Sequence, residues 1–184
     1  MRIKQFGDPI LRKVSQPISQ QDIHSDHIQS TLQTMKNVLN GIKAISDENG
    51  NALSAPQVGH LVRMVLLRLD GQFVPMLNPS IKALNEGEFE FEEECFSFYN
   101  LRAKVSRASK VEVNYCDEHG KAHCIVLEGE AAGLIQHEID HLDGVLFLDR
   151  VKNTSSLVSI DYLLQNNQPR LQQVKSMIDY MTSD

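Results

Sequence analysis

The chain has 184 residues and a formal net charge of −6 at pH 7. With 41% hydrophobic and 23% charged residues it has the composition of an ordinary globular protein, which excludes disordered and fibrous classes. This length suits one domain with a single core, which we place at residues 1–184. The negative charge argues against nucleic-acid binding and against anionic membrane surfaces, because both require an excess of Lys and Arg.

Neither a membrane span nor an export signal is recognisable. No stretch approaches the ~18 apolar residues of a membrane span. The start of the chain, Met1 to Phe6, lacks the apolar stretch of a secretory signal. The cysteines are odd in number and do not suggest a disulfide framework: Cys95, Cys116 and Cys124. We therefore expect a cytoplasmic protein with no membrane partner.

Two helices are predicted before the first strand. Asp8 as N-cap and Pro9 at the first helical position predict a short helix through Lys13. A longer amphipathic helix is expected from about Asp26 to Ile42, because apolar side chains recur along one stripe: Ile28, Leu32, Met35, Leu39 and Ile42. A turn follows at residues 47–51.

The middle of the chain predicts strands, over residues 61–69, 73–77, 81–93, 102–107, 111–116 and 122–127. In the third of these, Phe89 and Phe91 alternate with glutamates, so one face is buried. Helical periodicity returns over residues 129–142, 155–164 and 169–181. These elements predict a single α+β domain, with antiparallel or mixed sheets packed around the helix at 129–142 and a C-terminal helix.

The most informative motif, His137-Glu138-Ile139-Asp140-His141, lies in the helix predicted over residues 129–142. Side chains four positions apart share one face of a helix, so both imidazoles can point at one metal ion. Glu138 would then lie beside the ion, where a carboxylate can take a proton from water. The alternative is a solvated helix face that carries two histidines by chance.

A catalytic site of this type needs a third protein ligand. One peptidase class takes a histidine six positions after the second, where this chain has Phe147. Another class takes a downstream glutamate, but no glutamate follows Glu138. Both classes are therefore disfavoured. The possible third ligands are one upstream cysteine and three downstream aspartates: Cys95, Asp149, Asp161 and Asp179.

Cys95 is preferred among these as a ligand. It follows Glu92, Glu93 and Glu94, and three carboxylates beside a thiol disfavour its thiolate, which argues against a free nucleophilic cysteine. A divalent cation would reverse that balance and deprotonate the thiol.

A predicted hairpin carries a competing group of possible zinc ligands: Cys116, His119, His123 and Cys124. His123 and Cys124 are neighbours on a strand and point to opposite faces, which argues against one shared ion. We prefer free cysteines with solvated histidines here, and we expect His119 and His123 to be metal-free.

Three segments together resemble the peptide deformylase family, over most of the chain from Arg2 to about Arg150. Residues 50–59 are similar to the family's Gly- and Ala-rich loop that ends in glutamine. The segment Glu93-Glu94-Cys95-Phe96-Ser97 is similar to its Glu-Gly-Cys-Leu-Ser stretch. Residues 136–141 match its Gln-His-Glu-x-Asp-His motif without departure. Three motifs in the same order are more specific than any one of them.

The resemblance implies a hydrolase that removes the N-formyl group from the N-terminal formyl-methionine of nascent proteins and releases formate. It also implies a role for each of several side chains. The metal ligands would be Cys95, His137 and His141, the general acid/base Glu138, and the oxyanion donors Gln57 and the backbone N–H of Phe96.

The resemblance further implies ferrous iron (Fe2+) as the metal in the cell. One thiolate and two imidazoles also suit zinc, nickel or cobalt, any of which could occupy purified protein. The implied partners are N-formyl-methionyl nascent peptides, met at the ribosome.

The substrate groove is expected between residues 50–53 and residues 94–96, with His137 beside the pocket for the methionine side chain. The substrate-binding residues would be Gly50, Asn51, Ala52, Leu53, Glu94 and Leu134. The chain departs from the family pattern at Ala52 and Glu94, where the family keeps glycine, and at Ser54 and Tyr99, where it keeps alanine and usually proline. We expect Ala52 to crowd the groove and Glu94 to add a negative charge at its mouth.

Three other functions are weighed against deformylation. A metallopeptidase with the same helix motif lacks its usual third ligand here. A non-catalytic paralogue with a purely structural metal would not need Glu138. A deformylase-like paralogue, of low activity or acting on another N-acyl peptide, is compatible with the altered groove.

Overall fold

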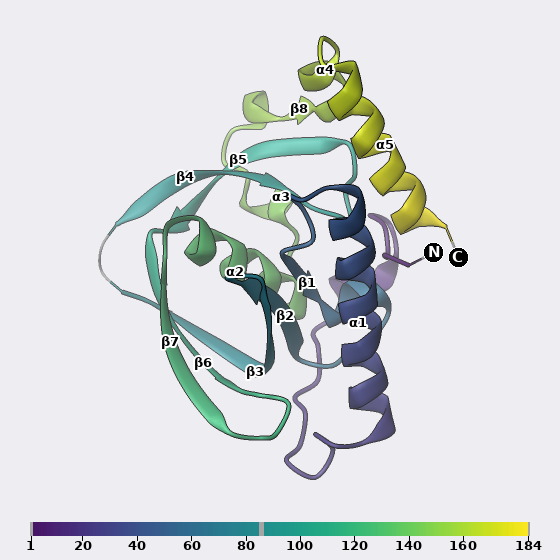
Figure 1. The fold of residues 1–184 in the computed structure, drawn as a ribbon. Helices are drawn as coiled ribbons and strands as arrows, with labels where there is room; N and C mark the ends of the chain where they lie inside the picture. Colours follow the sequence, from purple (N-terminus) through teal and green to yellow (C-terminus); the bar gives the residue numbers. More distant parts are fainter. Residues whose placement is uncertain (1, 85–86, 184) are drawn as a thin grey trace.

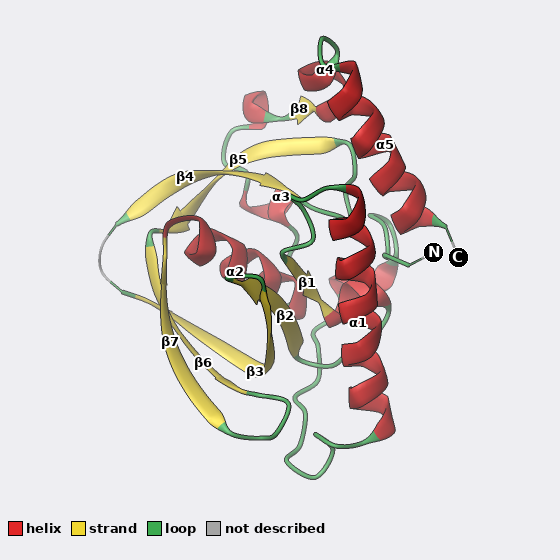
Figure 2. Cartoon of the chain, viewed as in Figure 1, coloured by secondary structure: helices red, strands yellow, loops and turns green. Residues whose placement is uncertain are grey.

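The structure, a computed structural model, describes residues 2–84 and 87–183. Two antiparallel sheets form its framework (Figures 1 and 2). The first sheet has the strand order β1-β2-β3-β6-β7, with β1 at Ala52–Ser54, β2 at Met64–Leu69, β3 at Gln72–Ala83, β6 at Lys110–Cys116 and β7 at Ala122–Glu128. The second has the order β4-β5-β8, with β4 at Glu88–Glu94, β5 at Leu101–Ala108 and β8 at Val158–Ser159.

Helix α2 (Gly129–Leu142) lies between the two sheets and packs against strands of both (Figure 1). Ala132, Ile135, Ile139 and Leu142 recur at helical spacing and are buried against strands β2, β3 and β6. Burial of each larger side chain stabilises the fold by about 1.5–3 kcal/mol. This packing fixes the rotation of α2 and therefore the direction in which its polar face points.

The remaining helices are α1 (Asp26–Ile45), the short α3 (Phe147–Arg150), α4 (Ile160–Leu164) and α5 (Gln168–Thr182), with 3-10 turns at Pro9–Arg12, Ala55–Val58 and Thr154–Ser156. Of these helices, α1 packs against β1 and β2 of the first sheet and α5 packs against α1, whereas α3 and α4 contact β5 and β8 of the second sheet. Helix α1 begins where the Ser25 hydroxyl accepts a hydrogen bond from the Ile28 N–H. Helices α1 and α5 lie side by side, and a β-carbon on Gly41 would overlap the ring of Tyr180 (Figure 1).

The predicted α+β class, with antiparallel sheets around the helix at 129–142 and a C-terminal helix, is confirmed. Two of the predicted elements are wrong. The strand expected over residues 81–93 is divided: its first residues continue the strand expected over 73–77, so that β3 runs unbroken from Gln72 to Ala83, and β4 begins at Glu88. Asn85 and Glu86 lie outside the described residues. The helix expected over residues 155–164 is interrupted, because Val158 and Ser159 pair with Arg102 and Leu101 at the edge of β5.

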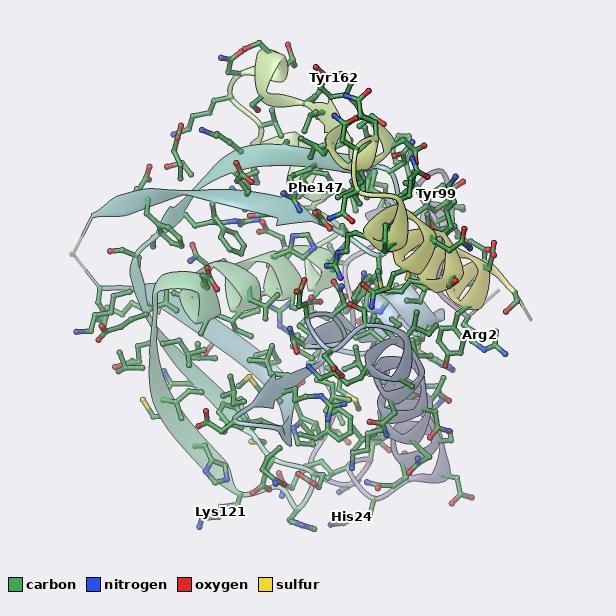
Figure 3. All side chains as sticks on the ribbon, turned by 45° about the horizontal axis from the view of Figure 1, so that its top comes forward. Arg2, His24, Tyr99, Lys121, Phe147 and Tyr162 are labelled. Carbon is green, nitrogen blue, oxygen red and sulfur yellow. The ribbon has the colours of Figure 1, made fainter. Side chains whose placement is uncertain are left out.

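Within the described ranges, no helix is both long and apolar enough to cross a bilayer. Figure 3 shows how the side chains are distributed, with Tyr162 at one end of the molecule and Lys121 and His24 at the opposite end.

Candidate active site

The face of α2 that is turned toward the second sheet carries two buried histidines. Rings of His137 and His141 have centroids 4.9 Å apart, as expected for positions one helical turn apart. Strand β4 approaches this helix closely at Gly133, where a β-carbon would stand 2.9 Å from the Phe91 ring. A glycine in the helix therefore lets β4, and the cysteine that follows it, come near the histidines.

Cys95 follows directly after β4 and completes a group of three. Its Sγ atom lies 3.2 Å from Nε2 of His141, and one ligand atom from each of Cys95, His137 and His141 lies within 4.8 Å of the others. All three side chains are buried. Two of the downstream aspartates that were possible third ligands have other partners. Asp149 pairs with Arg12, and Asp161 accepts a hydrogen bond from Asn100.

A buried ion-pair network orients His137. Nδ1 of His137 lies 2.7 Å from a carboxylate oxygen of Glu93, and this leaves Nε2 as the ring nitrogen available to a metal. Arg107 donates to both oxygens of Glu93, at 2.6 and 3.0 Å, and to Asp140 at 2.6 Å. Arg150 contacts the same Asp140 at 2.7 Å. Each buried charge of the network is thus paired, as burial requires.

The sequence analysis missed this network, although a signal for it was present. Glu93 continues the alternation of Phe89 and Phe91 on the inward face of β4, and Arg107 continues that of Val105 on β5. The side chains of Glu92 and Glu94 lie on the other face and contact Arg102. The three carboxylates therefore do not crowd the thiol together.

The network also sets the electrostatics of the site. Burial alone would raise the pKa of Glu93, but hydrogen bonds from His137 and Arg107 lower it. Burial opposes protonation of His137, yet Cys95 and Glu93 raise the pKa of this ring well above its usual value. Burial, with the charge on His137, holds the pKa of His141 well below its usual value. The carboxylate of Glu93 thus lies beside the ligand group, and its negative charge favours a cation there.

The donor set fits a divalent metal ion. One thiolate and two imidazoles, buried and held within a few ångströms, are ligands for zinc or for another first-row ion. Nδ1 of His141 and one carboxylate oxygen of Glu138 are buried without a hydrogen-bond partner in the described part of the chain. An unpartnered carboxylate oxygen beside the ligands is suited to a water or substrate group. Burial raises the pKa of Glu138 to about 7.

Gln57 lies beside Cys95, in the 3-10 turn that follows β1. Its Oε1 accepts hydrogen bonds from the backbone N–H and from the hydroxyl of Ser54, both at 3.0 Å. This fixes the amide so that Nε2 faces Cys95 Sγ, at 3.7 Å, and Ser97 Oγ, at 3.3 Å. The amide N–H is therefore presented to the site as a donor.

A pocket opens at these residues, with a cavity volume of about 210 Å³. The catalytic end is lined by Gln57, Cys95, Phe96, His137 and Glu138. Of the expected substrate-binding residues, Gly50, Asn51, Ala52, Glu94 and Leu134 line it.

The expectation that Leu53 lines the groove is wrong. Among the described residues, Leu53 is not one of those that line the pocket. It is fully buried in the core beside α1, since strand alternation turns it away from its neighbours. Ala52 borders the pocket but is only 4% exposed and also packs in the core beside α2.

The negative charge of Glu94 at the pocket mouth is offset. Arg102, which also lines the pocket, donates from Nε to Glu94 at 2.6 Å. The expectation that Glu94 simply adds a negative charge is therefore wrong.

The hairpin residues lie in or between strands β6 and β7, and among the described residues they do not belong to the group of possible metal ligands: Cys116, His119, His123 and Cys124. His123 Nε2 lies 2.7 Å from Asp117, and this hydrogen bond lowers the pKa of Asp117 to about 2. Cys124 pairs in register with Asn114 and is exposed, whereas Cys116 is only partly so. His123 is thus half-buried and paired with a carboxylate, whereas His119 is exposed.

A His-Glu-x-x-His motif on a helix, together with a cysteine from the end of a neighbouring strand, forms the ligand set that is typical of a metal-dependent hydrolase. Comparison with known proteins narrows this class. The sequence model of the polypeptide deformylase family matches residues 1–156, and the chain belongs to that family.

Relatives and solved structures agree with this assignment. The chain is 37% identical over 151 residues to a peptide deformylase of Treponema pallidum, covering 82% of this chain and 88% of that one. A Synechococcus elongatus peptide deformylase in complex with actinonin superposes with a TM-score of 0.75 at 30% identity, covering 93% of this chain and 87% of the other. A class I type b enzyme from Acinetobacter baumannii, bound to Met-Ala-Ser, gives a TM-score of 0.71 at 28% identity, covering 81% and 96%.

Proposed function

We infer that the chain is a deformylase, which removes the N-formyl group from the N-terminal formyl-methionine of nascent proteins and releases formate. The observation that carries this proposal is the convergence of Cys95, His137 and His141 beside the buried carboxylate of Glu138. The family match and the peptide bound to the Acinetobacter enzyme support the substrate class.

Cys95, His137 and His141 would hold one divalent ion, which supplies Lewis-acid activation of water and of the formyl carbonyl. Glu138 takes the proton of the attacking water. Because burial raises its pKa to about 7, the same group can return the proton to the departing amine near neutral pH. A cation at the three ligands would lower this pKa and favour the base form.

Gln57 and the backbone N–H of Phe96 would stabilise the oxyanion that forms on the formyl oxygen. The two hydrogen bonds from Ser54 support this role for Gln57, because they hold its N–H toward Cys95 in advance of the reaction. Gly50, Asn51, Ala52, Glu94 and Leu134 would contact the peptide, since all of them line the same pocket.

We further propose that residues 1–184 form one catalytic domain that acts in the cytoplasm on peptides emerging from the ribosome. Ferrous iron is the proposed ion in the cell. Metal analysis of protein purified without air tests this, and zinc retained with full activity under those conditions would contradict it.

The activity is tested by measuring formate release from a formyl-methionyl peptide, in parallel with cleavage at internal peptide bonds. We expect formate and an intact peptide. Internal cleavage would indicate a metallopeptidase, whereas faster release of acetate from an acetyl-methionyl peptide would indicate a different N-acyl substrate. Metal binding without any hydrolysis would indicate a non-catalytic paralogue.

A further inference from the structure

The far wall of the catalytic pocket is built by the two C-terminal helices. Its side chains are aliphatic or thioether groups: Leu163 and Leu164 of α4, and Val174, Met177, Ile178 and Met181 of α5. All of them lie beyond residue 156, where the match to the family model ends.

Helix α4 is tied to the segment that follows Cys95. The side-chain oxygen of Asn100 accepts hydrogen bonds from the Asp161 N–H and the Ser159 hydroxyl, both at 3.2 Å. The backbone oxygen of Asn100 accepts one from the Ile160 N–H at 3.3 Å. With the pairing of β8 to β5, these bonds fix the start of α4 relative to the catalytic end of the pocket.

Helix α5 is tied to the opposite wall. Arg170 donates to Glu48 at 2.6 Å and to the Ser46 hydroxyl at 3.3 Å, and Gln173 donates to the backbone oxygen of Ile45 at 2.8 Å. These partners directly precede Asn49 and the groove residues 50–52. The C-terminal helices are therefore bonded to both sides of the groove.

The pocket is larger than a methionine side chain requires. One water needs about 10–15 Å³ of such volume, so 210 Å³ has room for roughly 14–21 groups of that size, which is more than a methionine side chain fills. The cations in its wall are already paired, Arg170 with Glu48 and Arg102 with Glu94. The C-terminal wall therefore offers a ligand apolar surface.

We propose that α4 and α5 bind the peptide residues that follow the formylated methionine, and that they select apolar side chains there. The proposal rests on the deformylase function. A charged side chain against this wall would lose hydration without gaining a partner. Met177 and Met181 are only 6% and 3% exposed and also pack in the core beside α1, so they border the pocket with flexible thioethers, while Leu163 presents the most exposed apolar side chain of the wall.

The test compares three peptide amides with the metal-loaded protein: formyl-Met-Leu-Leu, formyl-Met-Asp-Asp and formyl-Met-Lys-Lys. We expect kcat/KM for the Leu-Leu peptide to exceed that for either charged peptide by a factor on the order of 10 or more, mainly through KM. Equal kcat/KM for all three would overturn the proposal and leave the deformylase function standing. Absence of formate from every peptide would instead contradict the function itself.

Two variants distinguish the effect of a charge that lies in the pocket wall from the general effect of an added charge on the protein. Leu163 lines the pocket and is 44% exposed, so Leu163→Lys is expected to fold. It should lower kcat/KM for the Leu-Leu peptide at least about fivefold and raise the relative rate for the Asp-Asp peptide. Tyr162→Lys places the same charge one position earlier, at a 65% exposed side chain that does not line the pocket, and should change neither. Equal shifts in both variants would overturn the proposal.

Discussion

Oε2 of Glu93 lies 2.7 Å from Nδ1 of His137, and this contact determines which nitrogen of the ring faces the cysteine. A carboxylate on one imidazole nitrogen fixes the tautomer and strengthens the other nitrogen as a ligand. Arg107 donates to both oxygens of this carboxylate, so the orientation of His137 depends on residues of two other elements, β4 and β5.

Glu93→Gln tests that dependence. The amide keeps the size of the side chain but loses its charge, and we expect metal affinity to fall about 10- to 100-fold. Competition with a chelator measures the loss. Glu92→Gln, on the outward face of the same strand, is the matched control and should leave affinity unchanged. Equal affinity in the two variants would show that the contact does not tune the ligand.

Glu138→Ala should separate metal binding from turnover. The metal content should stay the same, because Glu138 is not one of the grouped ligands, while kcat falls by a factor on the order of 100 or more through loss of a positioned base. Metal analysis and formate release are measured on one preparation. Loss of the metal in this variant would make Glu138 a structural residue.

Ser54→Ala should weaken the positioning of Gln57. The hydroxyl supplies one of two hydrogen bonds to Oε1, and a bond worth about 1 kcal/mol corresponds to a roughly fivefold lower kcat. Gln57→Ala should cost more, about 100-fold or above, because it removes the donor itself. Adding Ser54→Ala to Gln57→Ala should then have no further effect on kcat. A full additional loss in the double variant would show that Ser54 acts independently of Gln57.

Gly41→Ala should destabilise the protein, although the same change in an exposed helix usually stabilises by roughly 0.5–1 kcal/mol. The new β-carbon would overlap the far end of the Tyr180 ring, which must turn away and give up its hydrogen bond to the Asn37 backbone oxygen and its contact with the Arg2 guanidinium. Urea unfolding measures the free energy of unfolding. Tyr180→Ala makes room for the new methyl group, so adding Gly41→Ala to that variant should not destabilise it further. A stability gain from Gly41→Ala alone would mean that the ring turns away at no cost.

The free energy of unfolding should depend on His60 as the pH falls. Burial, and then the neighbouring His27 with its ring 5.2 Å away, lower the pKa of His60. The unfolded chain takes up a proton near pH 6.5, whereas folded His60 does so only at lower pH. Stability is therefore lost between pH ~6.5 and the folded pKa, and the loss levels off below it.

His60→Gln should reduce this loss in urea titrations from about pH 8 to about pH 5. His24→Gln, at an exposed histidine, is the control and should leave the pH dependence unchanged. An unaltered pH dependence in His60→Gln would assign the effect to other histidines.

Local sequence patterns were enough for most of the fold. The helix at 129–142 was placed correctly because apolar periodicity and its position after a hairpin agree, and α1 was placed from its stripe of buried side chains. The short strand at Val158–Ser159 could not be predicted, because only the free edge of β5 makes those residues extended. Tertiary pairing overrides local propensity there.

The site was predictable where the chemistry resides in a motif. Convergence of Cys95 with the helical histidines followed from the family resemblance, but the pairing of Glu93 with Arg107 required the register of two strands. The periodicity of the tail predicts a helix at 169–181, but it does not tell which neighbour that helix covers. The pocket wall built by α4 and α5 therefore appears only in three dimensions.

The spacing of the ligands has a consequence for unfolding. Cys95 and His141 are 46 positions apart, so one ion bound by both would close a long loop in the chain, much as a disulfide does. If the ion stays on both ligands in the unfolded chain, loop-closure entropy alone corresponds to about 4 kcal/mol for a loop of this length. If it dissociates instead, its binding energy adds to the stability of the fold. In either case removal of the metal would loosen the link between the end of β4 and α2, and the Glu93–His137 contact would be left to hold that strand to the helix.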